Sequence, residues 1–297
     1  MWNKLKGQTG RANPQRQVPQ PEARRKPVPR LLNLAPRPLI LPNEKMVISW
    51  SPKCACTHVL MWYLAQAKLL GDARRYDAWP HMYRQHVLQK SDAYRAARRG
   101  VYRTNGEGFT LLKVTRSPVA RMTSIFRHAI RSKPIKRAIA QGLGYDVEAS
   151  GVSLRDLDRF MTGRDLLPPS EIDQHLCAQT QPMWNMPFSR VITLNIDTDN
   201  LDENLERIEA VFGLDPVQID EHSELKTMAE YHYAKPPEGQ LDGAIEEFRF
   251  TKATRHLFSK AAFQAHPEIA RMAHEHHPWD FNGTNSSDTE GEIFSVP

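Results

Sequence analysis

Cysteine is scarce in this chain of 297 residues, where only Cys54, Cys56 and Cys177 occur. Cys54 and Cys56 are too close in sequence to pair, and an odd, sparse set does not make a disulfide framework. Zinc is equally disfavoured, because the C-x-C spacing has no matching second pair. We therefore expect no metal site and a reducing, cytoplasmic setting.

Long apolar runs are missing as well. The sequence has no stretch of about eighteen apolar residues, so we expect no membrane-spanning helix. The N-terminal segment carries charge without an apolar core behind it, which argues against a secretory signal. Apolar residues make up 40% of the chain and charged residues 25%, as in ordinary globular proteins. A chain of this length favours one folded domain with tails.

Acidic residues are nearly absent from residues 1–40, which contain nine lysines or arginines and only Glu22. This segment alone carries more positive charge than the whole chain, whose net charge is +6, so the remainder is slightly acidic. The folded core is therefore not predicted to bind nucleic acid. Many prolines and few aromatic residues predict a disordered basic tail, which is either a solvated leader or a tether to an acidic surface. We place the folded domain at 41–282 and a second, polar tail at 283–297.

Short apolar runs alternate with helical patterns along the rest of the chain. Buried strands are predicted at residues 45–50, 109–115 and 190–195. Helical patterns cover much of 57–106, 118–130, a segment starting at 153, 201–212, 244–262 and 267–276. This alternation predicts an α/β fold with a central parallel sheet flanked by helices. In such folds ligands bind beyond the carboxyl ends of the strands, so the loops after Trp50 and Thr115 are the expected site.

The loop after the first strand reads Ser-Pro-Lys-Cys-Ala-Cys-Thr over residues 51–57. Small residues before a helix allow its backbone N–H groups to converge on an anion, and the helix dipole adds partial positive charge. Lys53 supplies a full charge and Thr57 a hydroxyl. The pattern is not G-x-x-x-x-G-K-[ST], because the lysine comes early and the second glycine is absent.

The loop after the second strand continues into a helix that begins at Pro118. Arg116 stands at the end of the strand, where its planar donor fork can bind a phosphate bidentately. Arg121 and Ser124 are three residues apart on the helix and share a face. This loop therefore predicts a second anion site beside the first.

Both segments resemble those of sulfotransferases that use 3′-phosphoadenosine-5′-phosphosulfate (PAPS). The first is similar to the P-K-x-x-x-T loop, and its Cys-Ala-Cys-Thr version resembles the carbohydrate (Golgi-type, family 2) branch. The second is similar to R-[DE]-P-x-x-R-x-x-S-x-[YF], with Ser117 in place of the usual acid. The resemblance spans about residues 45–282 and implies a three-layer, P-loop-like sulfotransferase fold.

The resemblance also implies roles for individual residues. Lys53 is expected to contact the sulfonate and the bridging oxygen, and Cys54, Ala55, Cys56 and Thr57 to bind the 5′-phosphate. Arg116 and Ser124, with Arg121, are expected to anchor the 3′-phosphate. No metal is required, because Lys53 and helix N–H groups can stabilise the leaving phosphate. The acceptor is expected to be a hydroxyl of a glycan or glycolipid.

A base must take the proton of the acceptor hydroxyl, and histidine suits that task. His175 is the first choice, in the segment Asp173–Pro182 that is similar to the family's H-W-x-x-Q region. Near the end, Asp280-Phe281 is similar to the family's closing D-F element. The alternative bases are His58, His81, His86, His128 or a carboxylate within 72–106. His274, His276 and His277 are interpreted as surface residues.

Two other classes of function stay open at this stage. One is a nucleotide kinase or triphosphatase of the P-loop type, which the early lysine disfavours and which magnesium dependence would distinguish. The other is a non-catalytic protein that binds an anionic ligand or glycan, against which the intact Lys53 argues.

Overall fold

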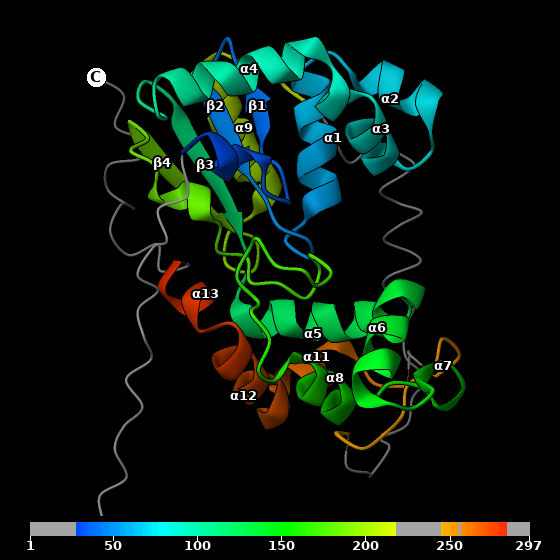
Figure 1. Cartoon of the computed structure of the whole chain (residues 1–297). Helices are drawn as coiled ribbons and strands as arrows, with labels where there is room; N and C mark the ends of the chain where they lie inside the picture. The colour runs from blue at the N-terminus through cyan, green and yellow to red at the C-terminus, as the bar shows by residue number, and fades with distance from the viewer. Residues whose placement is uncertain (1–27, 218–244, 255–256, 284–297) are drawn as a thin grey trace, which may run out of the picture.

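The computed structural model describes residues 28–217, 245–254 and 257–283. It is a mixed α/β fold in which helices flank a four-stranded, mostly parallel sheet, as the strand–helix alternation predicted. Figure 1 shows the sheet and its helices in one half of the molecule and a wholly helical assembly in the other. Each half has a hydrophobic core of its own.

The strands follow one another across the sheet in the order β1 (Leu39–Leu41), β2 (Met46–Ser49), β3 (Thr110–Thr115) and β4 (Arg190–Asn195). Strands β2, β3 and β4 run parallel, which confirms the three predicted strands. Strand β1 was not predicted. It pairs antiparallel with β2 and forms the edge of the sheet.

The predicted N-terminal tail is too long at its C-terminal end. A 3₁₀ helix, η1 (Val28–Asn33), precedes β1, and Leu32 and Leu39 are buried in the core of the sheet half. The high proline content was misleading, because prolines did not prevent a 3₁₀ helix at Val28–Asn33 or the pairing of a short apolar run with β2. Residues 1–27, like 284–297, lie outside the described ranges.

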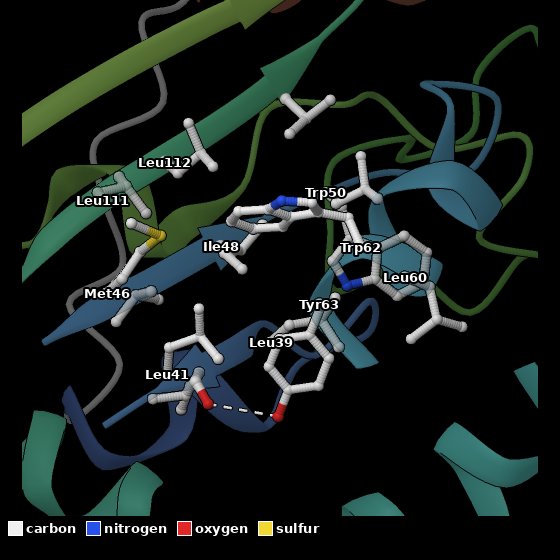
Figure 2. Close-up of a cluster of buried hydrophobic side chains, with 14 of the residues drawn as sticks. Leu39, Leu41, Met46, Ile48, Trp50, Leu60, Trp62, Tyr63, Leu111 and Leu112 are labelled. Carbon is white, nitrogen blue, oxygen red and sulfur yellow. Dashed lines mark hydrogen bonds between the residues drawn. The ribbon is translucent and has the colours of Figure 1, made fainter. Parts of the chain in front are cut away.

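Within the described ranges, the sheet half contains five α-helices and two further 3₁₀ turns. They are α1 (Cys56–Gln66), α2 (Leu70–Tyr76), α3 (Pro80–His86), η2 (Leu88–Lys90), α4 (Asp92–Arg103), η3 (Pro182–Asn185) and α9 (Leu201–Phe212). Helix α1 is buried along most of its length (Figure 2). Trp62 donates from Nε1 to Glu209 of α9 at 2.7 Å, and Tyr63 donates from its hydroxyl to the Ile40 carbonyl at 3.3 Å. Helix α1 is thereby joined to α9 and to the edge strand β1.

The helical half is built from segments far apart in sequence. They are α5 (Pro118–Ala129), α6 (Lys133–Leu143), α7 (Val147–Ser150), α8 (Leu154–Met161), α11 (Lys260–Ala265), α12 (Pro267–His276) and α13 (Pro278–Gly283). The helix predicted at 244–262 is wrong. Residues 245–254 form turns and one antiparallel bridge between Val152 and Phe250, and α11 begins only at Lys260. Gly151, at φ +85°, lets the Phe250 backbone approach so closely that a Cβ there would lie 2.8 Å from its carbonyl oxygen.

Strands β2 and β3 are parallel neighbours, so their carboxyl ends reach the same edge of the sheet. In Figure 1 this edge faces the helical half, and the chain passes from β3 directly into α5. The loops after β2 and β3 therefore meet at the junction of the two halves, where the sequence placed the site.

Candidate functional site

The loop after β2 is held in a strained conformation by its neighbours. Lys53 and Ala55 have positive φ angles of 73° and 47°, a region that costs a non-glycine residue about 1 kcal/mol. The carbonyl oxygens of Pro52 and Lys53 accept hydrogen bonds from the guanidinium groups of Arg121 (3.3 Å) and Arg116 (3.1 Å). The two predicted anion loops thus form one unit, in which the second fixes the first.

Helix α1 begins at the end of this loop with an open N-terminus. Ala55 is its N-cap, no side chain caps it, and its first turn contains no acid. Free N–H groups and the helix dipole attract anions at such a position. Among the described residues, no carboxylate pairs with the Lys53 ammonium group. Burial, together with Arg131 and Arg116, lowers the pKa of Lys53 to about 8, although Cys56 acts in the opposite direction.

Arg116 lies at the end of β3 and is only 8% exposed. Its Nη1 donates to Ser124 Oγ at 2.6 Å, which joins the two residues predicted to bind the 3′-phosphate. Its Nε is 3.3 Å from both carboxylate oxygens of Asp197, which also accepts the Ser117 N–H at 3.0 Å. The acid that position 117 lacks is thus contributed by the loop after β4. Within the described ranges, the Nη2 donors of Arg116 have no acceptor.

Lys260, the first residue of α11, is a basic residue of the site that the sequence did not single out. Burial and then Arg116 lower its pKa, while Asp197 acts to raise it. The ammonium group therefore lies near the Arg116–Asp197 pair. No motif signalled this residue, because it reaches the site only through the packing of α11 on α5.

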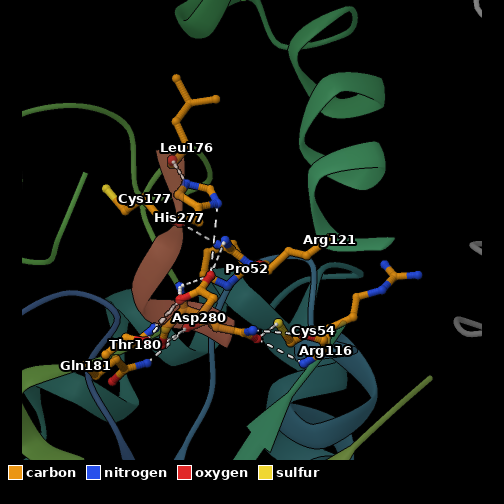
Figure 3. A network of polar contacts seen from close by, with 12 residues as sticks. Pro52, Cys54, Arg116, Arg121, Leu176, Cys177, Thr180, Gln181, His277 and Asp280 are labelled. Carbon is orange, nitrogen blue, oxygen red and sulfur yellow. Dashed lines mark hydrogen bonds and ion pairs between the residues drawn. The ribbon is translucent and has the colours of Figure 1, made fainter. Parts of the chain in front are cut away.

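Arg121 does not lie where a ligand can reach it, which corrects the prediction that it binds the cofactor. Its side chain is completely buried. Nη2 donates to the Cys177 carbonyl at 2.7 Å, and Nη1 lies 3.6 Å from the Asp280 carboxylate. The i, i+3 spacing placed Arg121 near Ser124 but could not show that other segments cover it. Arg121 instead links the loop after β2 to α13 (Figure 3).

Gln179 and Asp280, from the two weaker motif segments, hold the loops in place. Asp280 is fully buried and accepts the backbone N–H groups of Gln179 and Thr180, both at 3.0 Å. The Gln179 amide accepts from the Arg116 N–H (2.9 Å) and the Cys54 thiol (3.2 Å), and it donates to the Arg116 carbonyl (2.7 Å). Figure 3 shows Cys54, Arg116, Thr180 and Asp280 within this network of polar contacts. Sequence reasoning named these segments without recognising this positioning role.

His175, the predicted base, forms a pair with Asp173. Its Nδ1 lies 2.6 Å from Asp173 Oδ1, and its ring stacks on His128 at a centroid distance of 4.2 Å. A carboxylate at Nδ1 keeps the proton there and leaves Nε2 with a free lone pair. Burial acts to raise the pKa of Asp173, but hydrogen bonds from His175 outweigh it and hold that pKa below its ordinary value. The arrangement is suited to proton acceptance at Nε2.

Two other candidate bases, His128 and His81, lie near His175. Burial, then the charges of Lys53 and His175, hold the pKa of His128 far below its ordinary value. Burial lowers the pKa of His81 to about 3, and its Nε2 lies 3.1 Å from Thr57 Oγ1. Both rings are therefore neutral near pH 7, and each is more weakly basic than an ordinary histidine.

The remaining candidate bases are engaged elsewhere. His58 faces α9, 2.7 Å from Asp202, and His86 shares a hydrogen bond with the exposed Tyr76. Carboxylates within 72–106 bond to residues of their own turns. The structure thus brings together His175, His128 and His81 and leaves the others apart.

The predicted 5′-phosphate residues differ in what they can offer. Ala55 and Cys56 are partly exposed at the start of α1. Cys54 is fully buried, and burial raises the pKa of its thiol to about 12, so it serves the loop rather than a ligand. The Thr57 hydroxyl lies 3.1 Å from His81 Nε2. The uncapped backbone N–H groups at the start of α1, with Lys53, are therefore the main donors for an anion.

Of the three C-terminal histidines that we predicted at the surface, only His274 is exposed. His276 and His277 are both buried, and His277 Nε2 lies 2.9 Å from the Leu176 carbonyl. Within the described part of the chain, no group of three or more His, Cys, Asp or Glu is arranged to hold a metal ion.

Comparisons of the chain with protein-family models, curated proteins and solved structures find no match of any kind. None of the helices in the described ranges is sufficiently long and apolar to cross a membrane. The function of the site is therefore inferred from its own residues.

Proposed function

We propose that this protein is a PAPS-dependent sulfotransferase whose α/β core is the three-layer, P-loop-like fold of that family. One observation carries the proposal: two open cationic positions lie on adjoining strand ends and share hydrogen bonds. The first is Lys53 with the uncapped start of α1, and the second is Arg116 with Ser124. A nucleotide with phosphates at both its 5′ and 3′ positions needs two such sites at a fixed separation.

In this proposal the 5′-phosphosulfate lies at the start of α1, and Lys53 binds the bridging oxygen and the sulfonate. Arg116, Ser124 and Lys260 bind the 3′-phosphate, with the open Nη2 of Arg116 as the main donor. Arg121 is reassigned from ligand contact to positioning, because its side chain is completely buried.

The transfer is an in-line displacement at sulfur. The acceptor oxygen forms a bond to sulfur, the bond from sulfur to the bridging oxygen breaks, and 3′-phosphoadenosine-5′-phosphate leaves. The hydroxyl proton passes to His175 Nε2, with Asp173 stabilising the charged ring. Lys53 and the N–H groups of α1 meet the negative charge that grows on the leaving phosphate.

The remaining parts of the proposal follow the resemblance. The acceptor is a hydroxyl of a carbohydrate, in a glycan or glycolipid. A reducing, cytoplasmic setting is supported by the three cysteines, all of them described residues and all free thiols.

The test is a calorimetric titration with 3′-phosphoadenosine-5′-phosphate, and separately with ATP and magnesium. We expect binding without magnesium that Arg116→Ala weakens at least tenfold, because charged hydrogen bonds contribute about 1.5–3 kcal/mol. Arg103→Ala, an exposed arginine of α4, is the matched control and should leave the affinity unchanged.

Each other outcome would contradict the proposal. Tighter binding of ATP with magnesium would favour a nucleotide kinase or triphosphatase. Equal binding by Arg116→Ala would remove the 3′-phosphate site. Tight binding of PAPS with no transfer to any hydroxyl acceptor would point to a non-catalytic binding protein.

A further inference from the structure

Arg84 of α3 is a buried cation without a polar partner. Arg84 is only 4% exposed, and its Nε atom is buried without a hydrogen-bond acceptor. Its guanidinium lies 4.3 Å above the centre of the Trp50 ring. Burial lowers the pKa of Arg84 to about 10, which still leaves it charged at neutral pH. Throughout the described ranges, no carboxylate pairs with it.

The contacts that Arg84 makes do not offset the free-energy cost of burying its charge. An unpaired ion in a protein interior costs several kcal/mol even after relaxation. Stacking on an aromatic ring returns about 0.5–2 kcal/mol, which offsets only part of that cost. A guanidinium that lies over a tryptophan ring without a polar partner keeps its donor fork available for an oxyanion that comes from outside the protein.

The surroundings of Arg84 separate it from the cations assigned to the donor. Cys56 and Tyr94 are the ionisable groups that act on Arg84, whereas Lys53 is influenced by Arg131, Arg116 and Arg121 as well as by Cys56. Arg84 and Lys53 thus share only Cys56 as a neighbour of this kind. The cation therefore lies close to Cys56 at the start of α1, whereas Arg116, Arg121 and Arg131 are not among the groups that shift its pKa.

A chain of ring contacts joins this cation to the start of α3: the ring of His81 lies 6.0 Å from that of Trp50, on which Arg84 stacks. Trp79 stands at the N-cap of α3, is 41% exposed, and lies 5.1 Å from the ring of His81. His81 in turn contacts Thr57 at the start of α1. Positions 81 and 84 are three apart and share a helical face. One short helix therefore presents a ring platform, a contact to the phosphate loop and an open cation.

We propose that Arg84 is the subsite for an oxyanion of the acceptor, and that the ring of that acceptor packs on Trp79. This inference rests on the proposed function and refines it: the acceptor is an acidic carbohydrate, with a sugar acid as its simplest form. Arg84 selects the acceptor and does not hold the donor.

The probes are D-glucuronate, D-glucose and D-glucose 6-phosphate, each titrated by ligand-observed NMR into the full chain. Titrations are made with and without saturating 3′-phosphoadenosine-5′-phosphate. The variants are Arg84→Gln and, as a matched control, Arg98→Gln, whose guanidinium lies 5.7 Å from the Tyr94 ring centre. Trp79→Ala tests the platform.

We expect glucuronate to bind the wild type at least about tenfold more tightly than glucose, as a charge-assisted contact requires. Arg84→Gln should abolish that difference and leave nucleotide affinity unchanged, while Arg98→Gln should keep it. Trp79→Ala should weaken both neutral and acidic sugars to a similar extent. If glucose 6-phosphate binds better than glucuronate, the oxyanion is a phosphate and the subsite stands.

Three results overturn the inference. They are equal affinity for glucuronate and glucose in the wild type, an undiminished difference in Arg84→Gln, and loss of nucleotide affinity in Arg84→Gln. The last would assign Arg84 to the donor. Failure of the proposed function is recognised separately, because then the nucleotide does not bind the wild type while the sugar titrations still give an answer.

Discussion

The buried network around Gln179 and Asp280 and the open cations around Lys53 lie side by side, yet they are built in opposite ways. In the network most polar groups have a partner: Asp280 accepts two backbone N–H groups and faces Arg121, and Gln179 uses both ends of its amide. Arg121 Nη1 and His277 Nδ1 make no hydrogen bond, but both lie within 4.0 Å of the Asp280 carboxylate. Among the described residues around Lys53 the charges are mostly positive, and the carboxylates there, Asp197 and Asp173, pair with Arg116 and His175.

The difference separates residues that support the fold from residues that are open to a ligand. A paired buried charge is stabilised by its partners and has nothing left for a ligand. An unpaired, desolvated cation destabilises the folded protein and is expected where a ligand completes it. On this criterion Arg121 belongs to the scaffold, whereas Lys53, Arg84 and the Nη2 face of Arg116 belong to the site.

Breaking the network should have the largest effect. Asp280→Ala leaves Arg121 buried without a counter-charge and removes the acceptor of two N–H groups, so we expect a loss of about 3–5 kcal/mol in the free energy of unfolding. Urea denaturation measures it. Asp92→Ala, which removes a fully solvated partner of Arg95, is the control and should cost under about 1 kcal/mol. Similar losses in both variants would show that the buried pair is not special.

Removing a cation that has no carboxylate partner should lower activity without lowering stability. Lys53→Met is expected to lower kcat about 10²–10³-fold, because charge stabilisation at the leaving group is lost. The thermal midpoint should stay constant or rise, since a desolvated ammonium is removed. The control is Lys113→Met, whose ammonium lies 4.8 Å from the Trp184 ring, away from the loop. A fall in stability with unchanged kcat would place Lys53 in the scaffold.

Lowering the pH should decrease the free energy of unfolding, because His277 in the buried network is neutral in the folded protein. Burial and then Arg121 lower the pKa of His277 to about 4 in the folded protein, against about 6.5 in an unfolded chain. Between these values the unfolded state binds one more proton, so stability is complete above about pH 6.5 and falls toward pH 4.

The matching variant is His277→Gln, which keeps a donor for the Leu176 carbonyl but does not titrate. Its unfolding free energy, measured in urea from pH 4 to 6.5, should change less with pH by about 1.4 kcal/mol per unit. An identical slope in both proteins would contradict the assignment of a neutral, buried His277.

Sequence reasoning located the strands and the open cations because both are local signals. Buried strands are short apolar runs, and Lys53 and Arg116 each follow one directly, so parallel pairing of β2 and β3 was enough to bring them together. The edge strand β1 escaped notice because its three residues lie among prolines, and a helix was wrongly assigned where a single bridge buries Phe250.

The network and the further cations could not be located in this way, because they depend on packing between distant segments. Whether Arg121 faces a ligand or the protein interior is decided by α13, which covers it with Asp280. Lys260 reaches the site through α11, and Arg84 is noticeable only because its environment offers no acceptor. Spacing along a helix predicts a shared face but not what covers that face.

The smallest expected effect lies where the two regions meet, at the pair of Asp173 and His175. Asp173→Asn keeps an acceptor near Nδ1 but removes the charge that stabilises the protonated ring, so kcat should fall about tenfold with nucleotide affinity unchanged. His175→Gly should lose far more activity and regain part of it when imidazole is added, because a small base can occupy the vacated space. Rescue of His81→Gly or His128→Gly by imidazole, with none for His175→Gly, would move the base to the other ring and leave the donor site as argued.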